Sequence, residues 1–156
     1  MNSEMAERIL PVFRAELPLD PDRDTRAREA VQSGLARLQA ALPDPIAWDV
    51  ARVDDVVELR LLTPQCLVTV SVDLDELAAY KPQPSVRSRG LDPASTSVTL
   101  SFGAPTRDED GHDGTVTRWS FSDLMGAFEV SGFVTDAGEP DRSEVLARRI
   151  AGQIGW

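Results

Sequence analysis

Cysteine and histidine each occur once in the 156 residues, as Cys66 and His112. One cysteine cannot form an internal disulfide, and the pair is too few for the four nitrogen or sulfur ligands of a structural zinc site. A Ser-His-Asp or Cys-His centre would have to use His112, which lies in a glycine-flanked segment that fixes its position poorly. The chain also lacks a phosphate-binding glycine loop, a G-x-S-x-G elbow and an H-E-x-x-H pair. We therefore expect no metal and no cofactor, and we assign no catalytic residues.

Long apolar runs are also missing, and none approaches the roughly 18 residues that a membrane-spanning helix needs. The first ten residues carry two glutamates where a secretion signal would carry positive charge before an apolar run. These absences predict a cytoplasmic protein that does not associate with membranes. The formal net charge of −10 repels nucleic-acid phosphates, so we expect no nucleic-acid partner. The one basic cluster, Lys81, Arg87 and Arg89, falls in a proline-containing segment that we predict to be a solvated loop.

The length and an apolar share of 42% are typical of one globular domain. We interpret residues 1–156 as a single α+β domain, with residues 1–19 as a loosely attached N-terminal helical segment. The predicted element order is α-βββ-α-βββ-α. In this arrangement two three-stranded antiparallel meanders are packed by the N- and C-terminal helices.

Two helices are predicted in the first 45 residues. The first begins near Ser3 and meets Pro11, which should kink or end it because proline lacks an N–H and clashes with the preceding turn. The second has Asp20 as its N-cap, with proline at the first helical position. Its apolar residues recur at intervals of three and four, which predicts one buried face: Ala27, Val31, Leu35, Leu38 and Leu42.

The next segment changes to an alternating pattern, which predicts a hairpin turning at Asp54-Asp55. In this register Trp48 faces Leu61 on the buried side, and Asp49 faces Arg60 on the solvent side. A third strand then uses the same buried face of the middle strand. Its predicted pairs are Leu61 with Val68, Leu59 with Val70, and Val57 with Val72.

The remaining elements follow from capping and alternation patterns. Asp73 and Glu76 form a capping box that opens a short helix through Tyr80, and residues 81–94 are predicted to be a long loop. Residues 96–102, 115–121 and 127–134 alternate as strands, and Gly132 is interpreted as a bulge or bend. Asp141 and Glu144 form a second capping box, which opens a helix with Leu146, Ile150 and Ile154 on its apolar face.

The densest group of ionisable side chains is the segment Asp108–Asp113. Its carboxylates and His112 could bind calcium or magnesium, but the glycine and glutamate spacing of an EF-hand is missing. The composition is equally typical of a hydrated hairpin tip, which we favour. Weak cation binding stays open.

Two classes of function remain. The first is a non-enzymatic protein-binding module, such as an accessory subunit, chaperone or inhibitor, whose partner is another protein or a second copy in a homodimer. The alternative is a small hydrolase that depends on carboxylates or a divalent metal. Partner binding is expected on the C-terminal helix, where Trp156 either folds back on its own domain or docks on a partner. The candidate residues are Val145, Arg148, Arg149, Ile154 and Trp156.

Overall fold

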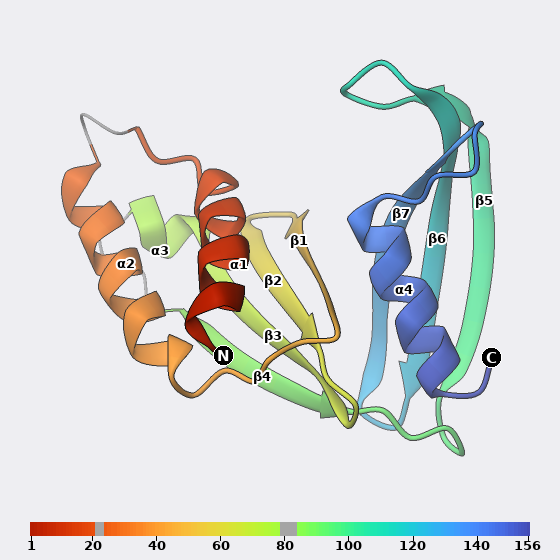
Figure 1. The fold of residues 1–156 in the computed structure, drawn as a ribbon, viewed down its shortest axis with the longest axis horizontal. Coiled ribbons are helices and arrows are strands. Elements are labelled where there is room, and N and C mark those ends of the chain that lie inside the picture. Colours follow the sequence, from red (N-terminus) through yellow and green to blue (C-terminus); the bar gives the residue numbers. More distant parts are fainter. Residues whose placement is uncertain (21–23, 79–83) are drawn as a thin grey trace. The chain divides into compact units, whose positions relative to one another are not determined.

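The computed structural model describes residues 1–20, 24–78 and 84–156 (Figure 1). It confirms an α+β fold, and the described residues form four helices and two antiparallel sheets. The chain forms two compact units, whose residues are Met1–Ile46, Val50–Thr63 and Leu67–Ser88 in the first unit, and Ala47–Asp49, Pro64–Cys66 and Arg89–Trp156 in the second unit. The interpretation of residues 1–156 as one domain stays a prediction.

The first sheet has four strands in the order β1-β2-β3-β4, rather than the three that the sequence predicts. Its elements and those around it are α1 (Ser3–Ala15), α2 (Thr25–Gln39), β1 (Ala47–Val53), β2 (Val56–Leu62), β3 (Cys66–Asp73), α3 (Leu74–Ala78) and β4 (Ser85–Gly90). The extra strand, β4, lies within the segment that we predict to be a loop. It carries only one large apolar residue, Val86, and its position at the sheet edge requires no buried face. Alternation therefore could not reveal it.

Helix α1 continues through Pro11 to Ala15, so the prediction that this proline ends it is wrong. Ile9 and Leu10 precede the proline and Phe13 follows it, and all three side chains are buried. Burial of apolar groups on both sides of Pro11 compensates for the hydrogen bond that proline cannot donate. Asn2 is the N-cap, and its side chain accepts a hydrogen bond from the amide of Met5 at 2.9 Å.

Helix α2 begins at Thr25 with Asp24 at the N-cap position, four residues after the predicted cap, Asp20. The proline of that prediction lies among residues 21–23, outside the described residues. The buried face of the helix is as predicted, with Ala27, Val31 and Leu35 in the core.

The predicted hairpin has the correct turn and the wrong solvent face. Asp54 and Asp55 separate β1 from β2, and Asp54 adopts a positive φ of 54°, which aspartate tolerates better than most residues. However, Asp49 is only 1% exposed and Arg60 only 7%, while Trp48 is half-buried. In β1, therefore, the side chain predicted to face solvent, Asp49, is buried, and the one predicted to be buried, Trp48, is more exposed.

Arg60 is buried because β2 is covered on both faces near its end, where Arg60, Leu61 and Leu62 are consecutive buried residues. An ion pair with Glu58, at 2.9 Å between Nη2 and Oε2, compensates for desolvation of the guanidinium. The predicted pairing of β2 with β3 is confirmed at every position named, including Leu59 with Val70.

The second unit contains a three-stranded antiparallel meander, β5-β6-β7, and one helix. Its elements are β5 (Ser97–Arg107), β6 (Asp113–Asp123), β7 (Gly126–Thr135) and α4 (Arg142–Gln153). Helix α4 packs along β7 and runs beside the sheet (Figure 1). The core between them comprises Trp119, Phe121, Val130, Leu146, Ala147, Ile150, Ala151 and Ile154.

Gly132 does not mark a bulge, because the β6–β7 register runs unbroken and pairs it with Thr117. The irregularity in this sheet lies instead between Phe102 and Pro105 of β5. Gly132 has a different role, since a Cβ atom there would lie 2.7 Å from the backbone of Glu144. The missing side chain allows the first turn of α4 to approach the strand closely.

No helix among the described residues is both long and apolar enough to span a bilayer.

Candidate binding groove

A cavity of about 600 Å³ opens in the second unit between α4 and the strands β5 and β6. We call it the groove. Its lining is mainly apolar and aromatic, with few charged groups. The lining residues are Leu100, Phe102, Thr115, Thr117, Trp119, Val134, Thr135, Asp136, Glu144, Arg148, Ala151, Gly152 and Trp156.

The floor of the groove follows from the alternation of β6. Thr115, Thr117 and Trp119 are alternate residues of β6, so their side chains share the sheet face on which α4 packs. Trp119 is buried, and its ring centroid lies 6.4 Å from that of Phe121 with the two rings nearly parallel. These large rings give the floor a fixed apolar surface.

Glu144 places a carboxylate at the bottom of the groove, with only 1% of the residue exposed. Its Oε2 accepts hydrogen bonds from the hydroxyl of Thr117 and, at 2.8 Å, from the indole Nε1 of Trp119. Its Oε1 accepts from Nε of Arg148 at 2.7 Å. Both oxygens are therefore engaged, as a buried charge requires.

The predicted capping box is only half formed. The side chain of Asp141 accepts a hydrogen bond from the amide of Glu144 at 2.7 Å, which confirms the N-cap. The Glu144 side chain bonds to β6 and to Arg148 of the next helical turn. The sequence predicted Glu144 only as part of a helix cap. It did not reveal that this carboxylate lies in the groove and bonds to Thr117 and Trp119 of β6.

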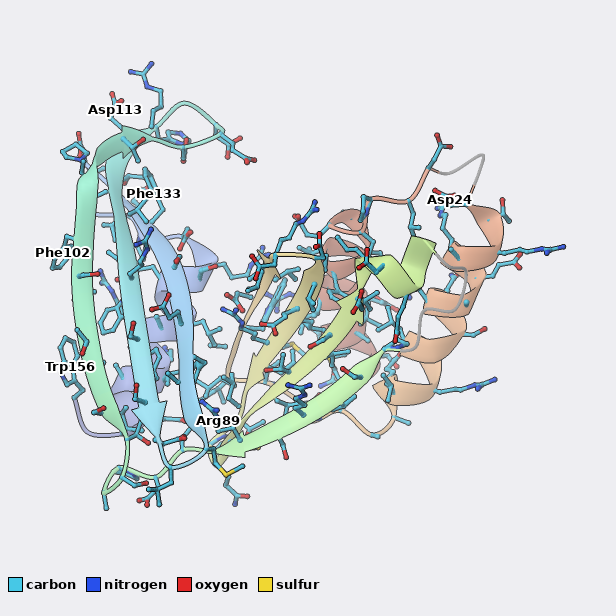
Figure 2. All side chains as sticks on the ribbon, turned by 180° about the vertical axis from the view of Figure 1, so that it is seen from behind. Asp24, Arg89, Phe102, Asp113, Phe133 and Trp156 are labelled. Atoms are coloured by element: carbon cyan, nitrogen blue, oxygen red, sulfur yellow. The ribbon has the colours of Figure 1, made fainter. Side chains whose placement is uncertain are left out.

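The rim of the groove exposes two aromatic side chains, Phe102 at 69% and Trp156 at 62%. Figure 2 shows both of them beside β5, along the same edge of the sheet. The Trp156 ring meets Trp119 edge-to-face, with 5.1 Å between the centroids and 79° between the planes. An edge-to-face contact is a favourable geometry for two indoles, so Trp119 on the floor of the groove helps to hold Trp156 at the rim.

Gly155 sets the backbone that carries Trp156. Its φ is +80°, in the left-handed region that glycine adopts without strain. The amide of Gly155 donates to the carbonyl of Gly152 and the amide of Trp156 donates to the carbonyl of Ala151. This is the hydrogen-bond pattern of a Schellman motif, and it fixes where the chain turns away from α4.

The geometry of the groove is the guide to function. No family model, no curated protein and no solved structure matches the chain. An apolar cleft with fixed aromatic walls and a few oriented polar groups is typical of a site that binds apolar groups of a ligand or a partner.

The five predicted partner-binding residues lie in three different environments. Arg148 and Trp156 line the groove. Val145 and Arg149 are exposed on α4 but do not line it, and Ile154 is buried in the core at 7% exposure. Trp156 folds onto its own unit and still exposes most of its surface, so its docking on a partner stays a prediction.

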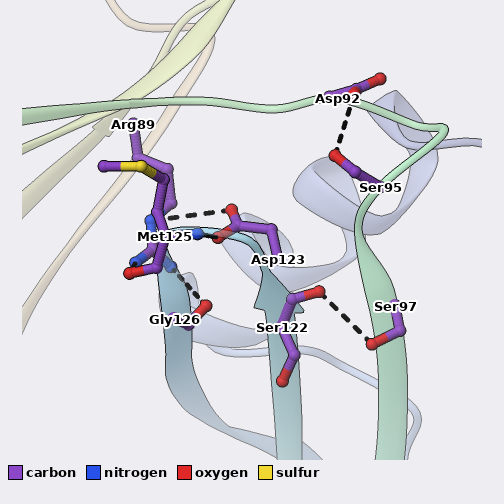
Figure 3. Close-up of polar contacts among 8 residues, drawn as sticks. All are labelled: Arg89, Asp92, Ser95, Ser97, Ser122, Asp123, Met125 and Gly126. Carbon is purple, nitrogen blue, oxygen red and sulfur yellow. Dashed lines mark hydrogen bonds and ion pairs between the residues drawn. The ribbon is translucent and has the colours of Figure 1, made fainter.

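A second group of contacts orders the turn between β6 and β7 (Figure 3). The Asp123 carboxylate accepts from the amide of Met125 at 2.7 Å, and Arg89 donates to the carbonyls of Met125 and Gly126 at 3.4 and 3.5 Å. Leu124 and Met125 are 95% and 80% exposed at the tip of this turn. Arg89, predicted as part of a solvated basic cluster, is thus bound to the hairpin, while Lys81 lies outside the described residues.

The acidic segment between β5 and β6 forms a tight turn. Asp108 accepts from the amide of His112 at 2.7 Å and contacts its imidazole Nδ1 at 3.1 Å, and Gly111 has a φ of +88°. The hydrogen bond from the His112 amide is the main cause that lowers the pKa of Asp108 below its usual range. Asp108, Asp110 and His112 are close enough together to hold a cation.

We expect no effect of calcium on stability, because the Asp108 oxygens are already used within the turn. Millimolar calcium should leave the melting temperature unchanged to within about 1 °C. Differential scanning calorimetry with calcium and with EDTA checks this. A large rise that the Asp110→Asn variant abolishes would show that the segment is a cation site.

Proposed function

We propose that this chain is a non-enzymatic protein-binding module, and that the groove receives an apolar segment of a partner protein. The main support for this proposal is the combination of a preformed apolar cavity with two aromatic side chains, Phe102 and Trp156, exposed at its rim. Large apolar groups gathered around a cavity in this way mark interaction sites, because exposing them to water is otherwise unfavourable.

The size and composition of the groove support a protein segment as the occupant. Its volume of about 600 Å³ lies within the range of sites that enclose several side chains or one ligand. Tryptophan and arginine are the residue types most enriched among those that dominate binding energy, and the groove offers Trp119, Trp156 and Arg148.

The alternative of a carboxylate hydrolase has less support from the geometry. The acids that line the groove are Glu144 and Asp136. Both oxygens of Glu144 already accept hydrogen bonds from Thr117, Trp119 and Arg148, so fewer lone pairs are free to activate a water. This arrangement suits a structural carboxylate that positions Arg148 and Trp119.

The proposal is tested by selecting peptides from a random phage-displayed library against the immobilised full chain. We expect the enriched peptides to carry large apolar or aromatic side chains. Their affinity, measured by fluorescence anisotropy, should fall by about 2 kcal/mol, roughly thirtyfold, in the Trp156→Ala variant. Phe102→Ser should act in the same direction.

Two controls separate the groove from other exposed apolar surfaces. Leu124→Ser removes an apolar side chain that is 95% exposed outside the groove, and should leave peptide affinity unchanged. Val145→Ser and Arg149→Ala test the neighbouring face of α4. If these helix variants abolish binding while Trp156→Ala does not, the groove is not the binding site.

A further inference from the structure

We propose that the partner segment is basic as well as apolar, with an arginine or lysine beside the side chain that enters the groove. This inference rests on the proposed function and adds the charge of the partner. It depends on the distribution of acids along the groove, whose two ends differ in chemistry.

One end of the groove is aromatic and the other is acidic. Trp119 and Trp156 form the aromatic end. The acidic end lies where β7 finishes, with Asp136 in the lining and Glu139 close by. The amide of Glu139 donates to the hydroxyl of Thr135 at 3.1 Å, and the amide of Thr135 donates to the carbonyl of Glu139 at 3.0 Å.

The backbone also joins this end to the start of β6. The amide of Asp136 donates to the carbonyl of Asp113 at 2.9 Å. Figure 2 shows Asp113 toward one end of the sheet and Trp156 toward the other, so the acidic and the aromatic ends of the groove are separated along the strands. A bound segment that spans the groove therefore meets an apolar site and a charged site in turn.

Ion pairing leaves a negative charge at the acidic end. Arg148 is paired with Glu144, and Arg107 is paired with Asp113 at 2.9 Å. Asp136 and Glu139 are both exposed and make no ion pair with any residue that the structure describes. Asp136 lines the cavity, and the backbone of Glu139 is bonded to another lining residue, Thr135. Unneutralised carboxylates at this end are complementary to an ammonium or guanidinium group beside an apolar side chain.

The overall charge favours the same partner. Residues 89–156 contain eleven acidic and six basic side chains, and the whole chain has a formal net charge of −10. A field of this sign attracts basic segments and raises their rate of association. It opposes a second copy of the chain, which carries the same negative charge.

The experiment uses the peptides selected on the full chain and a double variant, Asp136→Asn with Glu139→Gln. We expect the selected peptides to contain arginine or lysine within a few residues of an aromatic or aliphatic one. Their affinity should fall about fivefold in the double variant, which corresponds to about 0.5 kcal/mol for each exposed charge. Raising the salt concentration should reduce affinity for the wild type more than for the double variant.

The matched control is Glu7→Gln with Glu29→Gln, which makes the same change in net charge at exposed positions of α1 and α2. This variant should bind as the wild type does. Selected peptides without basic residues, or equal affinity in the double variant, would overturn the inference while leaving the groove as a binding site. Peptide binding that Trp156→Ala does not weaken would contradict the proposed function itself. A dimer of the chain alone that Trp156→Ala dissociates, seen by sedimentation velocity, would place a second copy in the groove and also overturn the inference.

Discussion

Replacing Glu144 by alanine is expected to destabilise the protein by about 3–5 kcal/mol, measured as the free energy of unfolding in urea. The change removes the acceptor for Thr117 and for the indole of Trp119, both of which are buried. Each donor would then be left without its hydrogen bond in a site shielded from water. Arg148 is affected less, because its side chain is 54% exposed and can be hydrated.

The conservative variant Glu144→Gln separates the hydrogen bonds from the charge. Its amide oxygen can still accept from Trp119, so we expect a smaller loss of about 1–2 kcal/mol. The indole N–H resonance of Trp119 in a nitrogen-15 NMR spectrum should move in the alanine variant and much less in the glutamine variant. An alanine variant within about 1 kcal/mol of the wild type would show that the buried carboxylate does not hold the floor of the groove.

Gly132→Ala is the second substitution with a large expected effect, a loss of about 3 kcal/mol. The added methyl group would lie 2.7 Å from the backbone nitrogen, the Cα and the Cβ of Glu144. None of these atoms belongs to the end of a flexible side chain, so either the helix or the strand must shift. Movement of α4 would also lengthen the hydrogen bonds from Glu144 to β6, which weakens the groove as well as the core.

Gly152→Ala is the matched control, because it adds the same methyl group within α4 where no atom lies within 4 Å. Alanine is the better helix former, so this variant should be more stable by about 0.5–1 kcal/mol. Urea titrations of the two variants should therefore move in opposite directions. Equal effects at both positions would mean that close packing under α4 is not what requires glycine at residue 132.

The strand pairings could be predicted because apolar alternation fixes register wherever one face is buried. Leu59 opposite Val70 is an example, since a slip of one residue would turn both side chains to the other face. The prediction failed where that condition fails. Strand β4 lies at an edge and is largely exposed, and Arg60 lies where both faces of β2 are covered.

The groove could be predicted only in part. Arg148 and Trp156 were accessible from the sequence because an amphipathic helix and a flanking indole suggest an interaction surface. Residues 96–102 were predicted as an alternating strand, but the 69% exposure of Phe102 depends on packing between elements, which alternation does not reveal. The role of Glu144 depends on contacts with β6, some 25 residues away in the chain, and its spacing from Asp141 resembles that of any capping box.

The left-handed turn at Gly155 has a consequence for the entropy of the proposed association. Because that turn and the edge-to-face contact with Trp119 already hold Trp156 in place, its rotational freedom is lost during folding rather than during binding. A rim side chain that is ordered beforehand spares association an entropic cost of about 0.5–1.5 kcal/mol. Affinity for the proposed partner segment should therefore depend on the backbone conformation at residue 155 as well as on the indole that it positions.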